Sequence, residues 1–434
     1  MIKQSVFIAI TIFSFGILVY SLLRVYSFLK LTKDYKTGPL GKRISITFMV
    51  AFFQTKILRR PIIGLLHALV FWGFVVILFG SLEIIIDGFT GLEKSLSSLG
   101  FVYHVISISG DVFSWVIFIA VGIFFIRRMF LNIKRFDGIE MKRRSHSDAN
   151  FALSLILVLM VTLIWMNILS SAMNLEQGRT LYPINALFGQ FFSSLDHSIL
   201  MDAYQINWWT HICVIFLFMN ILPYSKHFHV FMSIPNVFFS RTEPYGKLPN
   251  MDSITKEVKL MMDPNLAFAT PTEPVAEIER FGVKDVEDVT WKNYMDSLAC
   301  TQCGRCTAAC PANITGKMLS PRKIMLNLRA RMKEKAPRIL KEGKSYTDDK
   351  SLLRDYISTE EIWACTTCNA CVQECPVNIN HIEMIVFMRR FLVMEESAAP
   401  TGLNVMFSNI ENNGAPWPFS PEDRLLWAND LTTN

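Results

Sequence analysis

Eight of the nine cysteines gather in two short motifs in the second half of the chain. Both motifs read C-x2-C-x2-C-x3-C-P, the bacterial ferredoxin spacing in which the fourth cysteine ligates the cluster of the other motif. Three cysteines two residues apart let a tight loop wrap three corners of a cubane cluster. The rule therefore predicts two [4Fe–4S] sites, the first held by Cys300, Cys303, Cys306 and Cys375 and the second by Cys365, Cys368, Cys371 and Cys310.

Other uses of these cysteines fit the pattern less well. Structural zinc sites also use C-x2-C pairs, but zinc rarely takes two identical four-cysteine runs that each end in proline. Clustered cysteines also argue against a disulfide framework. The ninth cysteine, Cys213, lies inside an apolar run.

The first half of the chain has the composition of a membrane protein. The 434 residues are 51% hydrophobic, and five apolar segments each reach the roughly 20 residues that a helix needs to cross a bilayer. The predicted fold is an all-α membrane bundle of five helices, followed by a mainly α dicluster ferredoxin domain. The five predicted spans run approximately over residues 5 to 23, 61 to 86, 101 to 125, 151 to 173 and 206 to 224.

Basic residues set the expected orientation. The connection over residues 24 to 60 contains nine Lys or Arg and that over 127 to 148 contains seven, whereas the other two connections contain one each, Lys94 and Arg179. By the positive-inside rule the N-terminus is outside and the cysteine motifs are cytoplasmic. A reducing compartment keeps thiolates available for iron.

Four histidines on the predicted spans fall at two depths. His67 and His229 lie near the inner face, and His104 and His211 lie near the outer face. Two such pairs could provide the axial ligands of two stacked b hemes. An interfacial polar role is the alternative for each, and His227 competes with His229 as His197 does with His104.

Two carboxylates also fall inside the predicted spans. Asp111 lies two helical turns after His104, and Glu83 lies near the outer end of the second span. Ionisable groups at that depth are costly and often functional, so they could pass protons to or from a quinone. A hydrogen-bonded contact between helices is an equally good interpretation.

The soluble half begins after an irregular stretch. Residues 233 to 280 are rich in Pro, Asn and acidic residues, and they predict a linker between a membrane domain at 1 to 232 and a ferredoxin domain at 281 to 434. Between the cysteine motifs, residues 317 to 344 contain ten Lys or Arg. This stretch predicts a solvated basic helix face, with docking of an acidic partner or of lipid headgroups as the alternative.

These residues also carry a family resemblance. RRPIIGLLHALVFWGF and WWTHICVIFLFMNILPYSKHFH resemble the cytochrome b membrane subunit (gamma) of respiratory nitrate reductase. They resemble more closely the membrane part of heterodisulfide-reductase-like iron–sulfur oxidoreductases, including the type that links electron-transferring flavoprotein to quinone. CTQCGRCTAACPANITGKMLSPRKI, the second motif and NGAPWPFSPEDRLLWA resemble the cytoplasmic half of that group.

The resemblance implies a function. Such proteins exchange electrons between a membrane quinone such as menaquinone, b hemes, two [4Fe–4S] clusters and a cytoplasmic partner. The expected partner is a separate CCG-domain subunit or electron-transferring flavoprotein, without nucleic acid. The expected location is a bacterial or archaeal cytoplasmic membrane. The SK-x-x-H pattern favours His229 over His227.

The chain departs from these relatives in two places. Only His67 lies on the second span, so His104 must substitute if a second heme exists, and no CCG module follows the second motif. The expected role is therefore an oxidoreductase subunit that is catalytic within a complex. A quinol-linked heterodisulfide or thiol reductase subunit and a heme-free membrane anchor for a ferredoxin module are the alternatives.

Overall fold

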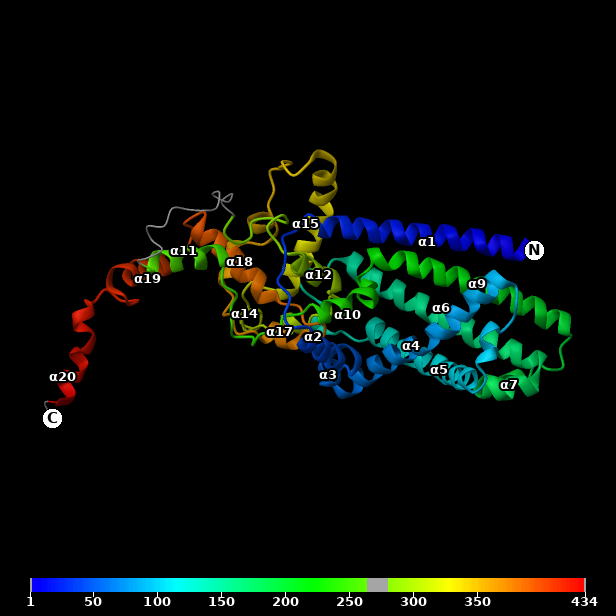
Figure 1. Cartoon of the computed structure of the whole chain (residues 1–434). Helices are drawn as coiled ribbons and strands as arrows, with labels where there is room; N and C mark the ends of the chain where they lie inside the picture. Colours follow the sequence, from blue (N-terminus) through cyan, green and yellow to red (C-terminus); the bar gives the residue numbers. More distant parts are fainter. Residues whose placement is uncertain (1, 264–279, 433–434) are drawn as a thin grey trace.

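The computed structural model describes residues 2 to 263 and 280 to 432, and nearly all of its regular structure is helical. A bundle of long helices forms one half, and shorter helices packed at one end of the bundle form the other (Figure 1). We call the end of the bundle next to this soluble half the near end and the opposite end the far end. The part of the predicted linker at residues 264 to 279 lies outside the described residues.

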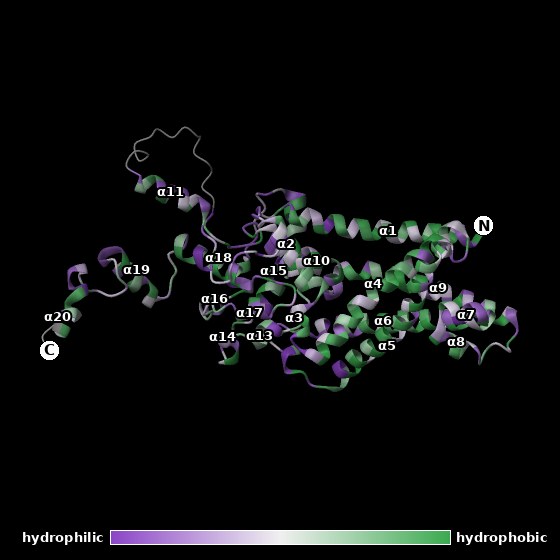
Figure 2. Ribbon diagram, turned by 60° about the horizontal axis from the view of Figure 1, so that its bottom comes forward, coloured by the Kyte–Doolittle hydropathy of each residue, from purple (hydrophilic) through white to green (hydrophobic). Residues whose placement is uncertain are grey.

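Five helices are long and apolar enough to cross a membrane, in agreement with the predicted number of spans. Many of their large apolar side chains point outward, as a lipid-facing surface requires, and the bundle is coloured mostly as hydrophobic in Figure 2. The five helices are α1 (Ile2–Leu29), α4 (Pro61–Thr90), α5 (Phe101–Phe130), α6 (Arg143–Met173) and α9 (His197–Ile221).

The helices extend beyond the predicted spans, because apolar composition marks the bilayer and not the helix ends. The largest differences are at the starts of α6 and α9, where the helix begins before the apolar run. Asp196 caps α9, with Oδ1 accepting from the Ser198 backbone N–H at 2.8 Å. Consequently His211 lies about 21 Å along α9 from its far end, deeper than the sequence predicted.

Short helices close the two ends of the bundle. At the near end, the basic connection between α1 and α4 folds into α2 (Leu40–Thr47), the π-helical turn η1 (Phe48–Phe52) and α3 (Thr55–Leu58). At the far end, α7 (Leu175–Leu181) and α8 (Pro183–Gly189) pack against α6. The Trp115 indole N–H donates to Asn185 Oδ1 at 3.0 Å and joins α8 to α5.

The soluble half has an apolar core that includes Val289, Leu298, Ile324 and Met384 and that extends to Phe28 of α1. Its long helices are α12 (Trp291–Ala299), α15 (Pro321–Glu342) and α18 (His381–Met394). The cysteine motifs add short helices between them. These are α13 (Arg305–Ala308), α14 (Pro311–Ile314), α16 (Thr359–Trp363) and α17 (Ala370–Glu374).

Part of the predicted linker is structured. α10 (His229–Phe238) continues from the bundle into the soluble half, where Asn236 is buried and its Nδ2 donates to Asp296 Oδ1 at 3.0 Å. α11 (Asp252–Met262) follows. The boundary predicted at residue 232 therefore falls inside a helix that belongs to both halves. At the other end of the chain, α19 (Thr401–Asn413) and α20 (Leu426–Thr432) extend away from the body (Figure 1).

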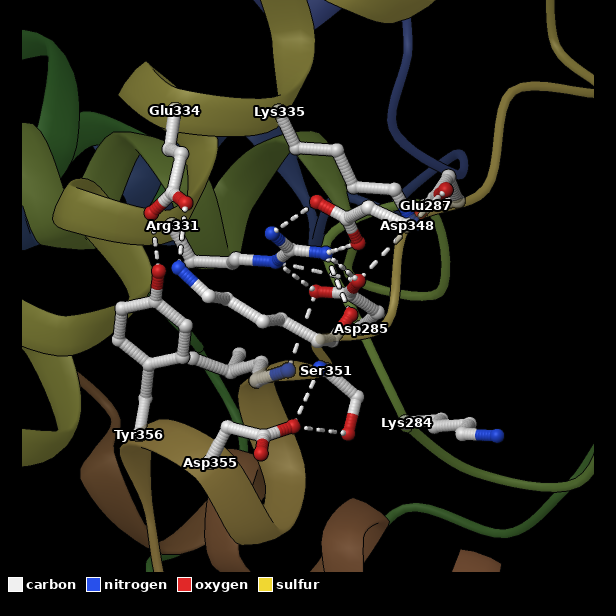
Figure 3. A network of polar contacts seen from close by, with 12 residues as sticks. Lys284, Asp285, Glu287, Arg331, Glu334, Lys335, Asp348, Ser351, Asp355 and Tyr356 are labelled. Atoms are coloured by element: carbon white, nitrogen blue, oxygen red, sulfur yellow. Dashed lines mark hydrogen bonds and ion pairs between the residues drawn. The ribbon is translucent and has the colours of Figure 1, made fainter.

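The predicted solvated basic face of residues 317 to 344 is wrong in part, because several of its cations are buried in ion pairs. Arg331 is fully buried, and its guanidinium bridges Asp285 and Asp348, with Nη2 2.7 Å from Asp285 Oδ2 (Figure 3). Lys335 Nζ contacts the same Asp285 oxygen at 2.9 Å. This network ties α15 to the segment before α12, and the sequence did not reveal it because the partners lie far apart along the chain.

Candidate redox site

The first cysteine motif and Cys375 meet at one place. Cys300 follows α12, Cys306 lies in α13, and Cys375 follows α17. Cys375 interacts electrostatically with Cys303 and Cys300. Cys306 interacts with these three cysteines and also with Cys371 of the second motif. The structure thus brings the fourth cysteine of the second motif to the first motif, and its ligation of the first cluster stays a prediction.

The second motif repeats this arrangement. Cys310, Cys365, Cys368 and Cys371 line one small cavity. The backbone has positive φ at corresponding positions of the two motifs, at Gln302 and Gly304 in the first and at Thr367 and Asn369 in the second. These left-handed residues turn the chain so that it wraps around the thiols.

The thiol sets fit [4Fe–4S] clusters. Within the described residues no three His, Cys, Asp or Glu side chains converge as one metal ion requires, whereas thiolates around a cubane are spread over its corners. Backbone N–H groups of Thr367 and Ile379 donate to Cys365 Sγ and Cys375 Sγ, each at 3.4 Å. Burial raises the pKa of Cys375 to about 12, so iron binding must displace its proton.

Cations surround the first cysteine set. Arg329 Nη2 donates to Cys300 O at 2.9 Å, and Lys56 Nζ donates to Cys375 O at 3.2 Å. Arg135 and Arg305 interact electrostatically with Cys303, and Lys226 does so with Cys300. Burial lowers the pKa of Lys226 to about 8, which still leaves it mostly charged at neutral pH.

His67 and His229 come together at the near end of the bundle, where they are close enough to interact electrostatically. His67 Nδ1 lies 3.2 Å from Gln54 Oε1, and His229 Nδ1 lies 3.3 Å from the Lys226 carbonyl oxygen. Both acceptors favour a proton on Nδ1 and leave Nε2 as a lone-pair donor. A metal-ligating histidine is usually held in this way.

The far-end pair is arranged differently. His211 is buried, and its Nδ1 lies 2.7 Å from Thr162 Oγ1, whose hydroxyl is within bonding distance of the Val158 carbonyl. His104 is exposed, and its ring lies against Tyr103 about 5 Å along α5 from the far end. The two rings thus have different depths and surroundings.

The competing histidines have separate positions. The His227 ring lies 5.9 Å from the His229 ring, and its Nδ1 is 3.2 Å from Ser225 Oγ. His197 begins α9 and lines a cavity toward the far end.

That cavity has a volume of about 800 Å³, and both predicted carboxylates line it. Asp111 is fully buried, with its two oxygens accepting from Ile184 N at 2.7 Å and Asn185 Nδ2 at 2.5 Å. Glu83 Oε1 accepts from Leu96 N at 3.2 Å, and its Oε2 lies 3.4 Å from the Tyr103 hydroxyl. Asp111 therefore ties α5 to α8, whereas Glu83 has the weaker contacts.

A single short segment links the histidine pair to the first cysteine set. Gln54, which contacts His67, has a left-handed backbone with φ of 51°, and Lys56 follows two residues later. Lys56 Nζ contacts Cys375 O, and Arg305 Nη1 donates to the Lys56 carbonyl at 3.1 Å. The two candidate iron sites are thus adjacent, with one layer of residues between them.

Residues 299–379 match the family of 4Fe-4S dicluster domains. Over 98% of its length the chain is 30% identical to the probable iron-sulfur-binding oxidoreductase FadF of Bacillus subtilis. The chain is homologous to iron–sulfur oxidoreductases. It is 28% identical, again over 98% of its length, to the EtfAB:quinone oxidoreductase of Syntrophomonas wolfei. It covers 60% and 58% of these two relatives.

Shorter matches agree with an iron–sulfur oxidoreductase. Over 35% of its length the chain is 34% identical to a probable membrane-anchored ferredoxin of Chromohalobacter salexigens, of which it covers 24%. Subunits of Methanosarcina heterodisulfide reductases also match parts of the chain. No solved structure matches it.

Sequence reasoning missed the residues that join the iron–sulfur site to the histidines. Gln54 and Lys56 belong to the basic connection over residues 24 to 60, and Arg135 belongs to that over 127 to 148. Both connections predicted only the orientation in the membrane. The sequence contains no local signal for these contacts, because the backbone carbonyls that Lys56 Nζ contacts, those of Val372 and Cys375, lie more than 300 positions away.

Proposed function

We propose that the chain is a membrane subunit that passes electrons between a cytoplasmic redox partner and the quinone pool through two [4Fe–4S] clusters and b heme. The adjacency of the half-buried His67 and His229 to the first cysteine set carries this proposal. Electron transfer requires closely spaced centres, and Gln54 and Lys56 bring the two sites together. Orientation with the N-terminus outside and the clusters in the cytoplasm follows from the basic connections.

The residues have distinct proposed roles. Cys300, Cys303, Cys306 and Cys375 would hold one cluster, and Cys310, Cys365, Cys368 and Cys371 the other. His67 and His229 would hold a b heme through Nε2, while Gln54 and the Lys226 carbonyl orient the rings. The iron centres supply reversible one-electron chemistry when bound.

One heme fits the described side chains better than two. His211 has the Nδ1 contact expected of a ligand, but its proposed partner His104 is exposed at the far end of α5. A second heme would need His104 to turn inward and reach a greater depth. We therefore assign the first heme to His67 and His229 and keep the outer pair as the weaker proposal.

The far-end cavity is the proposed quinone site, and electrons would reach it from the His67–His229 heme through a heme on the outer histidine pair. Cofactor and substrate pockets are typically concave, mostly apolar and supplied with a few polar groups. Glu83 is the candidate that exchanges a proton with quinone, because its carboxylate makes longer contacts than that of Asp111. Asp111 would hold α8 in place at the cavity wall.

The relatives suggest the soluble partner. The name of the Syntrophomonas relative favours electron-transferring flavoprotein, and the heterodisulfide reductase relatives keep open a quinol-linked heterodisulfide reductase complex with a CCG-domain subunit. The membrane-anchored ferredoxin relative represents the heme-free alternative. Each is a proposal, because this chain covers only part of the relatives.

A reduced-minus-oxidised absorption spectrum of the purified protein tests the proposal. We expect b-type bands that are lost in both His67→Ala and His229→Ala, because each imidazole would supply one ligand to the heme iron. His227→Ala is the matched control and should keep the bands. Absence of heme from the wild-type protein, or full heme content in both variants, would contradict the proposed function.

A further inference from the structure

The two cysteine sets differ in their electrostatic surroundings. Around the first set, five side chains from five separate elements place positive charge near the thiols, and two of them donate to cysteine carbonyls. Two acids lie near these cations. Glu374 pairs with Arg60 at 3.9 Å, and Asp148 accepts from Lys226 N at 3.0 Å. The cations of the first set are Lys56, Arg135, Lys226, Arg305 and Arg329.

The second set has less positive charge against it. Among the described residues, Arg389 is the one cation whose side chain donates to a cysteine carbonyl of this set, with Nη2 2.5 Å from Cys365 O. The second set is also nearer to solvent, because Cys368 is exposed and Cys365 is half-buried. Cys300, Cys306 and Cys375 of the first set are buried beside the membrane half.

Arg135 gives the clearest sign that positive charge is directed at the first set. Its Nε and Nη1 are buried without an acceptor among the described residues. The largest charge interaction of its guanidinium is with Cys303. A buried guanidinium without a partner is costly unless negative charge faces it. A thiolate-bound cluster would supply that charge.

Charge and burial have opposite effects on the reduction potential. A cluster with four thiolates is anionic and gains one more negative charge on reduction, so nearby cations raise its potential. Burial lowers the potential, because the reduced state loses hydration. At the first set Arg329 and Lys56 donate to cysteine carbonyls, and three further cations interact with the thiols. We infer that their combined charge outweighs the effect of burial, since charges interact strongly where water is excluded.

We propose that Arg135, Arg305 and Arg329 give the cluster held by the first cysteine set the higher reduction potential of the two. The set with the exposed Cys368 is then the entry port for a reduced cytoplasmic one-electron donor, such as a flavin. The donor is oxidised by loss of one electron, which reduces the cluster of the second set. Transfer inward would then reoxidise that cluster and reduce the cluster of the first set. This inference rests on the proposed function for the presence of both clusters.

Redox titration of the purified full chain, followed by electron paramagnetic resonance, tests the order. We expect two [4Fe–4S] signals with separate midpoint potentials. Arg135→Gln should lower the higher potential and leave the lower one unchanged. It removes charge without breaking a side-chain hydrogen bond of the buried Nε or Nη1.

Three further variants keep the test decisive if Arg135→Gln disturbs the fold. Arg305→Gln should lower the higher potential, whereas Arg305→Lys retains the charge and should change it less. Arg389→Gln should lower only the lower potential. A shift of the wrong signal, or unchanged potentials in both Arg135→Gln and Arg305→Gln, would overturn the inference.

Iron, sulfide and heme content of the same samples separate this inference from the proposed function. Two clusters without heme, combined with the expected shifts, would sink the proposed function and support the inference. Heme and clusters with unshifted potentials would do the reverse. Absence of clusters would overturn both.

Discussion

Arg322 Nε lies 2.7 Å from Glu140 Oε1, and both side chains are almost completely buried. Arg322 is in the soluble helix α15, whereas Glu140 is in the connection between α5 and α6 of the bundle. The same guanidinium donates to the carbonyls of Arg135 and Asp137, each at 2.8 Å. One arginine therefore fastens the two halves together beside the first cysteine set.

We predict that Arg322→Met destabilises the protein by about 3–5 kcal/mol, because it leaves the Glu140 carboxylate buried without its ion pair. Glu140→Gln should cost less, about 1–3 kcal/mol, since its amide oxygen can still accept from Arg322 and Ser320. Thermal unfolding in detergent measures both. The exposed pair Arg338–Glu342 is the control, and Glu342→Gln should cost about 0.3–0.5 kcal/mol. A loss of stability in Arg322→Met no larger than that in Glu342→Gln would contradict the prediction.

If each motif supplies its fourth cysteine to the cluster of the other motif, replacing that cysteine should remove the other motif's cluster. Cys375→Ser should remove the cluster of the first motif, and Cys310→Ser that of the second, with about half of the iron lost in each. Iron and sulfide analysis with electron paramagnetic resonance checks this. Cys213→Ser, at an exposed position of α9, should keep full iron content. If Cys375→Ser removed the signal that responds to Arg389→Gln, the exchange would be wrong.

Glu383 predicts a pH dependence of stability. Burial, with a smaller contribution from Asp296, raises the pKa of Glu383 to about 7 in the folded protein. The unfolded value is near 4.3, so the folded state binds the proton more tightly, and stability falls as pH rises through about 7. Because glutamine does not ionise, Glu383→Gln should avoid about 2–4 kcal/mol of the fall in the free energy of unfolding.

Melting temperatures of wild-type and Glu383→Gln protein, compared from about pH 4 to pH 8, measure the effect. The curves should converge at the acidic end, and the variant should be the more stable at the basic end. Glu411→Gln, at an exposed position of α19, should track the wild type. Parallel curves for Glu383→Gln and wild type would rule out the assigned ionisation.

Gly304 and Asn369 occupy corresponding positions of the two motifs, but only the glycine is tightly enclosed. A Cβ at Gly304 would lie 2.1 Å from the Arg135 carbonyl oxygen, and φ there is 72°. Gly304→Ala should therefore lower the free energy of unfolding by about 1–3 kcal/mol. Asn369→Gly should have a smaller effect, because both residues accept the left-handed backbone. Limited proteolysis between the halves and thermal unfolding report the difference, and equal effects would refute it.

The features that were predictable from sequence depend on local spacing. Five apolar runs predicted five long helices, and the paired cysteine motifs predicted the proximity of Cys375 to Cys303. Helix ends were less predictable, because α9 begins at a capping Asp196 outside the apolar run. Hydropathy indicates which residues face lipid. A helix begins where a capping side chain accepts from its first free backbone N–H groups.

Contacts between distant segments were not predictable. The basic stretch at 317 to 344 looked like a solvated face, because nothing near Arg331 reveals that Asp285 and Asp348 reach it. The predicted depth of His211 was wrong, because α9 begins before the apolar run that marked the predicted span. Likewise, Gln54 has an ordinary sequence context, and only the fold places its amide beside His67.

The two-residue step from Gln54 to Lys56 has a mechanical consequence. Gln54 contacts the His67 imidazole and Lys56, two residues later, contacts the Cys375 carbonyl, so one short stretch of backbone would fix the separation of the two proposed iron sites. Such a junction leaves no room for a swinging carrier. Internal transfer should consequently proceed at the same speed in thick glycerol solutions as in dilute buffer, and only the encounter with the soluble partner should slow.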